Sequence, residues 1–122
     1  MTTLEVGKKL VELANQGKLQ QAAETLYSQD IASIEAGGPP NMAKEMYGIK
    51  AVMQKGQWWN ENHTVHSASC EGPFPKGDQF VVFYKFDVTN KPSNKRIQMH
   101  EAALYTVHNG KIVREDFFYT ME

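Results

Sequence analysis

The first third of the chain carries apolar residues at spacings of three and four, the pattern of helices with one buried face. It predicts a first helix over residues 3–16, with Thr3 as its N-cap and Gly17 as its end. A second helix is predicted from residue 18 to about residue 28. Only a glycine turn separates the two, so we expect them to pack as a hairpin. The apolar stripes consist of Val6, Leu10, Leu13 and Ala14, then Leu19, Ala22, Ala23 and Leu26.

The helical pattern then breaks. Residues 30–36 are predicted to form a short strand, which the run Gly37-Gly38-Pro39-Pro40 ends. Residues 37–47 are predicted to be an irregular loop. A third helix is predicted over residues 48–60, and its apolar side consists of Val52, Met53, Gly56 and Trp59.

The second half of the chain alternates with a period of two, which predicts strands. Four strands are predicted, over residues 63–72, 78–90, 95–108 and 111–120. The turn Asn109-Gly110 is a strong hairpin signal, so the last strands form an antiparallel meander. Helices first and strands later indicate an α+β fold rather than a parallel sheet. The length of 122 residues fits one domain, residues 1–122.

Composition excludes several classes of partner. The net charge is −1, and the densest basic stretch, residues 91–96, fits a solvated turn; we therefore expect no nucleic-acid partner. No apolar stretch approaches membrane-spanning length, so no membrane association is predicted. The single cysteine, Cys70, cannot form an internal disulfide, and no signal peptide is recognisable. These features predict a cytoplasmic protein.

The order of elements resembles the nuclear transport factor 2-like superfamily, and in particular its SnoaL-like members. The stretches that carry the resemblance are Tyr27 to Ile31, Trp58 to His63, Asp78 to Phe80, and Leu104 to Val113 with its Gly-Lys-Ile-Val hairpin. The resemblance covers nearly the whole chain. It implies a cone in which a curved, mostly antiparallel sheet wraps around three helices and encloses a pocket for a small molecule. The superfamily includes steroid delta-isomerases, polyketide cyclases, dehydratases and epoxide hydrolases, as well as proteins without known activity, so fold alone does not give function.

The resemblance implies a candidate base. In the steroid isomerases a catalytic carboxylate follows the helix-to-strand junction, and that position falls on Glu35. Glu35 could equally be a solvated residue at a strand end. The two oxyanion donors of those enzymes, a tyrosine and a protonated acid, fall on Val11 and Ala103, so steroid isomerisation by that mechanism is not expected.

The same alignment predicts the inner face of the last two strands. It places Met99, Glu101, Ala103, Tyr105 and Val107 on one strand and Val113, Glu115, Phe117 and Tyr119 on the other. Each face is apolar apart from one acid, which is costly unless paired. Either Glu101 and Glu115 bind or activate a ligand, or they pair with Arg96, Arg114, a histidine or a tyrosine hydroxyl and merely close the pocket.

Histidine and tryptophan complete the candidate site. His63, beside the Trp pair, is the best histidine candidate for the pocket, although a lone histidine on a strand is more often structural. One of the two adjacent tryptophans packs in the core and the other, Trp59, could roof the pocket. No spacing of ligands indicates a metal, and no cofactor is predicted.

The predicted site residues are therefore Glu35, Glu101, Glu115 and His63 for chemistry, with Trp59, Met99, Tyr105, Phe117 and Tyr119 contacting the ligand. They indicate acid–base chemistry of isomerase, cyclase, dehydratase or hydrolase type on a small, mostly apolar substrate. Because the two oxyanion donors are absent, a ligand-binding or accessory domain without turnover, or a protein adaptor, remains open.

The sheet's outer face predicts a homodimer. Phe80, Val82, Tyr84 and Phe86 form the inner face of one long strand, which the helices cover. The opposite face is also apolar at its centre, with Val81 and Phe83 beside Ala102 and Leu104. An uncovered apolar patch of this kind marks an interface, most commonly a two-fold one. The alternative is a solvated face, because Lys85, Asp87 and His100 lie on the same side.

Overall fold

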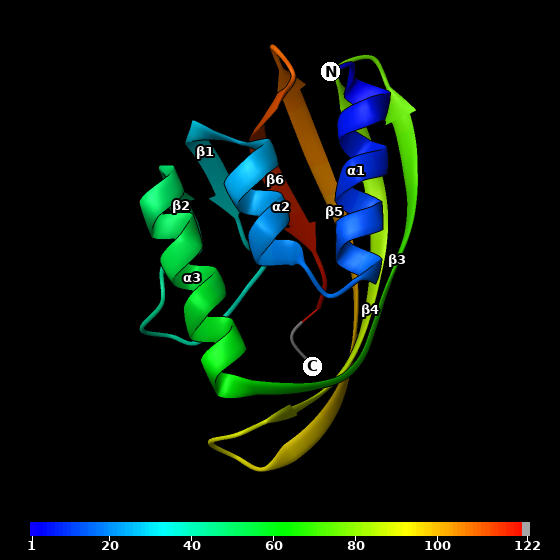
Figure 1. Cartoon of the computed structure of the whole chain (residues 1–122). Helices are drawn as coiled ribbons and strands as arrows, with labels where there is room; N and C mark the ends of the chain where they lie inside the picture. Colours follow the sequence, from blue (N-terminus) through cyan, green and yellow to red (C-terminus); the bar gives the residue numbers. More distant parts are fainter. Residues whose placement is uncertain (121–122) are drawn as a thin grey trace.

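In the computed structural model, which describes residues 1–120, three helices pack on the concave side of a curved six-stranded sheet (Figure 1). The helices are α1 (Thr3–Asn15), α2 (Leu19–Leu26) and α3 (Ile49–Asn62). The strands are β1 (Tyr27–Ile34), β2 (Glu45–Tyr47), β3 (His63–Lys76), β4 (Gln79–Asn90), β5 (Lys95–His108) and β6 (Lys111–Phe118). The α+β prediction is confirmed.

The α1–α2 hairpin follows from local signals. Thr2, rather than the predicted Thr3, caps α1: its hydroxyl accepts from the Glu5 amide, and the Glu5 carboxylate accepts from the Thr2 amide. Gly17 ends the helix with a φ of 74°, which glycine adopts without strain. The short turn then sends α2 back alongside α1.

The sheet runs in the order β2-β1-β6-β5-β4-β3. Strands β3 to β6 form the predicted antiparallel meander, and β1 pairs in parallel with β6. In that parallel pair Ser33 lies beside Glu115, which brings the early strand to the centre of the candidate site. The sheet is open, with β2 and β3 at its edges.

Several predicted boundaries are wrong, three of them where strands pair. β1 begins at Tyr27 rather than residue 30, because its first residue already pairs with Ile112 of β6. The predicted loop 37–47 ends in strand β2, which pairs with β1. β3 continues to Lys76, past the predicted turn at Gly72-Pro73. It is an edge strand, so one of its edges has no partner strand, and a proline facing that edge removes no hydrogen bond between strands.

The core lies between the helices and the inner face of the sheet. The predicted inner residues Phe80, Val82 and Tyr84 are at most 3% exposed, and Leu10 of α1 is fully buried among them. The inner face of β6 differs from the prediction. A register shift between Thr106 and Val107 brings Ile112, rather than Val113, into the core.

The outer face of the sheet carries large apolar side chains that no helix or strand of the described residues covers. Phe74, Phe83 and Phe118 are 49%, 46% and 55% exposed. The rings of Phe74 and Phe83 lie 5.7 Å apart. Arg96 and Arg114 pair on this side with Asp87 and Asp116. Within residues 1–120, no helix is both long and apolar enough to cross a membrane.

Candidate functional site

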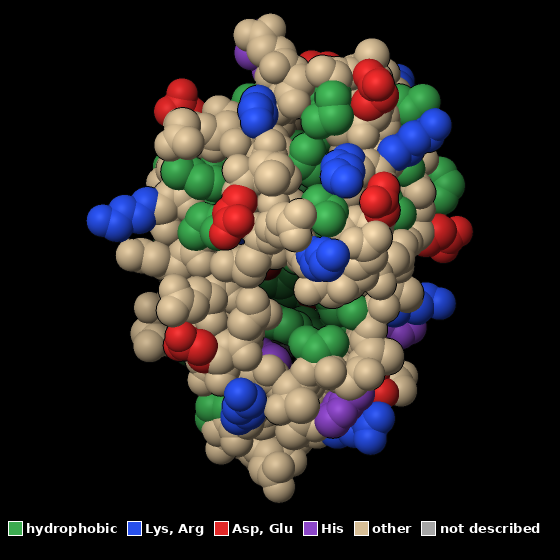
Figure 2. Space-filling view, in the orientation of Figure 1, with side chains coloured by type: hydrophobic (Ala, Val, Ile, Leu, Met, Phe, Trp, Pro, Cys, Tyr) green, Lys and Arg blue, Asp and Glu red, His purple; other side chains and the backbone are tan. Residues whose placement is uncertain are grey.

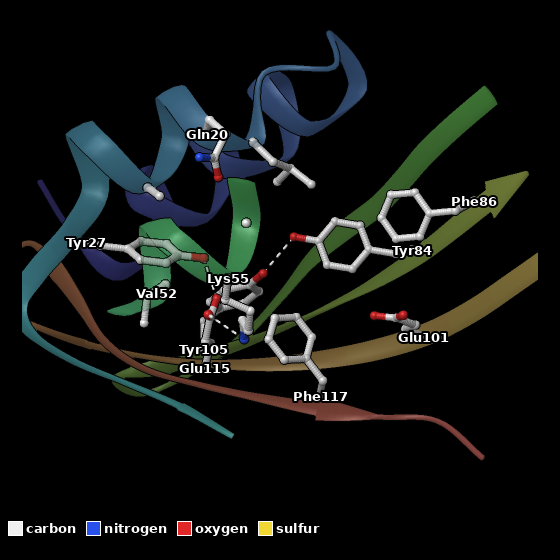
Figure 3. Close-up of a pocket in the computed structure, with 13 residues that line it drawn as sticks. Gln20, Tyr27, Val52, Lys55, Tyr84, Phe86, Glu101, Tyr105, Glu115 and Phe117 are labelled. Atoms are coloured by element: carbon white, nitrogen blue, oxygen red, sulfur yellow. Dashed lines mark hydrogen bonds and ion pairs between the residues drawn. The ribbon is translucent and has the colours of Figure 1, made fainter. Parts of the chain in front are cut away.

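A cavity of about 130 Å³ lies between the helices and the inner face of the sheet. Figure 2 shows the hollow in this side of the molecule, with hydrophobic side chains in its depth. Its walls are mostly apolar, and its polar groups come from helices α2 and α3 and from strands β1, β4, β5 and β6 (Figure 3). The lining residues are Leu19, Gln20, Ala23, Tyr27, Val52, Lys55, Gly56, Tyr84, Phe86, Glu101, Tyr105, Glu115 and Phe117.

Glu115 is buried and fully hydrogen-bonded. Tyr27 donates its hydroxyl proton to Oε1, and the Ser33 hydroxyl donates to Oε2 at 2.6 Å. The carboxylate is 2% exposed, and burial raises the pKa of Glu115 while the charge of Lys55 and the two hydrogen bonds oppose the rise. Among the partners predicted for a Glu115 that merely closes the pocket, the structure has the tyrosine hydroxyl, that of Tyr27. Glu115 is therefore held by donors rather than exposed to a ligand.

Lys55 joins the acids of the site. Its Nζ donates to Ser33 Oγ at 2.5 Å and to Glu35 Oε1 at 2.8 Å, and it lies 4.0 Å from Glu115 Oε2. Its side chain is only 15% exposed. The other oxygen of Glu35 accepts from the Tyr119 hydroxyl at 2.7 Å. Lys55 thus balances part of the negative charge that Glu35 and Glu115 bring into the site.

Glu101 differs from both other acids. Its carboxylate projects from β5 into the cavity (Figure 3), and none of the hydrogen bonds or ion pairs found in residues 1–120 involves it. Since no buried polar side-chain atom of the described chain lacks a partner, its oxygens face open space. Burial, reinforced by the charge of Glu35, raises the pKa of Glu101 to about 7, against the opposing charge of Lys55. A carboxyl group with this pKa can give or take a proton near neutrality.

Two buried tyrosines form the remaining polar wall. The hydroxyls of Tyr84 and Tyr105 lie 2.7 Å apart, and the Tyr105 ring stacks on Phe80 with centroids 5.1 Å apart. Burial raises the pKa of both phenols well above its ordinary value, so both stay protonated. They offer neutral hydroxyl groups to the cavity.

The predicted site residues fall into three groups. Glu101, Glu115, Tyr105 and Phe117 line the cavity. Glu35 adjoins it through Lys55, and Tyr119 bonds to Glu35. His63, Trp59 and Met99 do not line it.

The structure gives His63 contacts at the junction of α3 and β3. Its Nδ1 lies 2.8 Å from the Trp59 carbonyl oxygen, and its ring stacks on the Trp59 indole at 4.3 Å. Trp59 in turn touches Phe86, whose ring lines the cavity, with centroids 5.8 Å apart. Met99 is the neighbour of Phe86 in the β4–β5 register. These residues form a layer behind the cavity wall.

Lys55, Ser33, Tyr27 and Tyr84 were missed as site residues by sequence reasoning. One signal was present: Lys55 is three residues after Val52 and four before Trp59, so it shares their helix face. For the other three, the sequence shows nothing that separates them from core residues. Among the described residues, no group of three or more His, Cys, Asp and Glu side chains is placed to hold a metal ion.

Comparison with known proteins places these features in a family. The SnoaL-like domain family matches residues 1–119. A protein from Mesorhizobium loti, suggested to be a SnoaL-like polyketide cyclase, is 49% identical; the match covers 98% of this chain and 100% of that one, with a TM-score of 0.91. No curated protein matches the chain.

More distant structures share the fold. An NTF2-like protein from Burkholderia thailandensis is 16% identical, with a TM-score of 0.81 over 97% of this chain and 90% of that one. A protein from Catenulispora acidiphila with a ketosteroid isomerase-like fold, solved with trimethylamine, is also 16% identical, with a TM-score of 0.71 over 98% and 88%.

Proposed function

This chain belongs to the SnoaL-like domain family, and from that premise we propose that it transfers a proton on a small, mostly apolar carbonyl compound. The reaction is of the isomerase or cyclase type, in which a base removes a proton from the carbon beside a carbonyl group. The cyclase role suggested for the Mesorhizobium loti protein is of the same broad class. The observation that carries the proposal is the Glu101 carboxylate, which faces the cavity without a partner among residues 1–120 and has a pKa of about 7.

Glu101 is a better candidate for the base than the other two acids. The Glu35 carboxylate accepts from Lys55 and Tyr119, and the Glu115 carboxylate accepts from Tyr27 and Ser33. Donors that stabilise a carboxylate weaken it as a base. The role that the family resemblance assigns to Glu35 remains a prediction, and the experiment below separates it from that of Glu101.

The cavity limits the size of the substrate. An apolar cavity of about 150 Å³ in another protein holds a benzene molecule, and the cavity here measures about 130 Å³. A six-membered ring, or one ring of a larger molecule, therefore fits. Phe86 and Phe117 provide flat apolar walls for such a ring.

The experiment is exchange of the protons beside the carbonyl of cyclohexanone and related cyclic ketones in D2O, followed by NMR. We expect the wild type to accelerate exchange, with a rate that rises as pH increases through about 7, where Glu101 loses its proton. Glu101→Gln should reduce the rate to background. Glu71→Gln, the same change at an exposed position of β3, should leave it unchanged.

Other outcomes decide between the alternatives. Loss of exchange in Glu35→Gln but not in Glu101→Gln would assign the base to Glu35. Binding of the ketones with exchange at the background rate in the wild type would contradict an enzyme and support a ligand-binding domain without turnover.

Assembly and location complete the proposal. The exposed rings of Phe74, Phe83 and Phe118 support a homodimer that buries the outer face of the sheet. Cys70 is buried, and burial raises its pKa to about 12, so it is an unreactive thiol suited to a reducing compartment. We therefore propose a cytoplasmic dimer.

A further inference from the structure

Proton removal beside a carbonyl creates negative charge on the carbonyl oxygen, which needs a hydrogen-bond donor. The two donor positions implied by the family resemblance hold Val11 and Ala103, which cannot donate. On the basis of the proposed function, we infer that the ammonium group of Lys55 is the donor that holds this oxygen. Lys55 is then a catalytic residue in its own right, opposite the base Glu101.

The contacts of Lys55 leave one donor for a ligand. An ammonium group has three N–H donors. One is directed to Ser33 Oγ at 2.5 Å and one to Glu35 Oε1 at 2.8 Å. The distance of 4.0 Å to Glu115 Oε2 is too long for a hydrogen bond. Among the described residues, no acceptor takes the third N–H, and Lys55 lines the cavity.

The position of Lys55 also fits a ligand that reaches Glu101. Its Nζ lies 5.2 Å from the centre of the Phe117 ring. In Figure 3, Lys55 and Glu101 stand on either side of that ring. A carbonyl compound lying against Phe117 would place its oxygen at the ammonium group, with the C–H bond of the neighbouring carbon directed toward the carboxylate.

The tyrosines are weaker candidates. The Tyr27 proton is committed to Glu115. The Tyr84 and Tyr105 hydroxyls bond to each other, which uses one of their two protons. The proton that remains belongs to a neutral hydroxyl, whereas Lys55 offers a charged donor, and hydrogen bonds from charged donors are the stronger kind.

The chemical step balances without any further reagent. The Glu101 carboxylate takes the proton from carbon, and the electrons of that C–H bond form a carbon–carbon double bond. The carbonyl π electrons move onto the oxygen, which accepts from Lys55. Protonated Glu101 then returns the proton to carbon. The total charge in the cavity is the same before and after proton removal, because the charge lost by Glu101 appears on the oxygen.

The test uses para-nitrophenolate, whose oxygen anion on a flat ring resembles the proposed intermediate. Binding is measured by absorbance in the Glu101→Gln variant, where the amide imitates the protonated base. Adding Lys55→Met should weaken phenolate binding by about tenfold or more, the effect of losing a charged hydrogen bond. Adding Lys50→Met, the same change at an exposed position of α3, should not alter it.

Nitrobenzene separates a lost donor from a damaged cavity, because it has the same ring without the oxygen anion. It should bind equally well with and without Lys55. Equal loss of both probes in Lys55→Met would overturn the inference, as would unchanged phenolate binding. Loss of phenolate binding in Tyr84→Phe, with Lys55→Met unaffected, would assign the donor to Tyr84 instead.

One control protects the test against misfolding. Lys55→Met leaves Glu115 without its nearby cation, so the chain could fail to fold. In that case Lys55→Met is made together with Glu115→Gln and compared with Glu115→Gln alone. Phenolate binding needs no turnover, so it can fail while ketone exchange by Glu101 succeeds, and the reverse also holds.

Discussion

The environment of Glu101 predicts that its replacement makes the protein more stable at high pH. The group has an ordinary pKa of 4.5 and a pKa of about 7 in the folded chain. The folded protein therefore holds the proton more tightly than the unfolded chain does. Its stabilising contribution is complete below pH 4.5 and is lost as pH rises toward 7 and above, because the charge must then exist in a buried place. Glutamine imitates the protonated form and carries no such pH dependence.

The magnitude follows from the difference in pKa. One unit corresponds to about 1.4 kcal/mol, so a rise from 4.5 to about 7 amounts to roughly 3 kcal/mol. Glu101→Gln should therefore raise the free energy of unfolding by up to about 3 kcal/mol at pH 8 and leave it nearly unchanged at pH 4. In a chain of this length, the gain at pH 8 corresponds to an increase in Tm of about 10 °C.

Urea unfolding at pH 4, 6 and 8, followed by tryptophan fluorescence, measures this difference. Glu24→Gln is the matched control, because Glu24 is exposed on α2, away from the outer face of the sheet, and its replacement should change stability little at any of the three pH values. A Glu101→Gln variant that is less stable than the wild type at pH 8 would refute the reasoning. So would a gain of the same size at pH 4, because packing rather than charge would then be its cause.

Two further predictions concern packing and assembly. Phe83→Glu should convert the dimer into a monomer of 13.8 kDa, as measured by light scattering. Val65 is equally exposed (46%) but lies on the inner side of the sheet, so Val65→Glu should leave the protein dimeric. A monomeric wild type would contradict the dimer. Gly7→Ala should destabilise the fold by about 1–3 kcal/mol in urea, because the added Cβ would lie 2.8 Å from Pro73 Cβ. Gly56→Ala should be nearly neutral, because the 2.2 Å contact is with the movable end of Gln20; equal losses in the two glycine variants would show that this distinction is wrong.

The element order was predictable because each element carries its own periodic signal. Helix α1 ends one residue from its predicted end, and β5 has its predicted bounds. The errors fall where tertiary pairing decides. Strand β2 has three residues, too few to show alternation, and it exists because β1 offers it a partner. The start of β1 at Tyr27 likewise depends on β6, a strand more than eighty residues away in the sequence.

The inner faces of β5 and β6 were predictable in part, for a similar reason. Strict alternation places Glu101 and Tyr105 on the side that lines the cavity, and Glu115 and Phe117 as well. It fails at Val113, because the register shift beside Val107 inserts a residue and brings Ile112 inward. A period of two describes a regular strand and cannot reveal such a shift.

The sequence could not show which of three glutamates is the strongest base. Glu35, Glu101 and Glu115 all reach the same site, and nothing in their neighbouring residues ranks them as bases. Their properties depend on which donors reach them. Lys55 stands twenty positions from Glu35 and sixty from Glu115, and Tyr27 stands eighty-eight from Glu115. These donors lie on α3, on β1 and, for Tyr119, just after β6, and none of the described residues donates a hydrogen bond to Glu101. We therefore propose that the fold selects the base by leaving one carboxylate without donors, a property of the assembled sheet and helices rather than of any local motif.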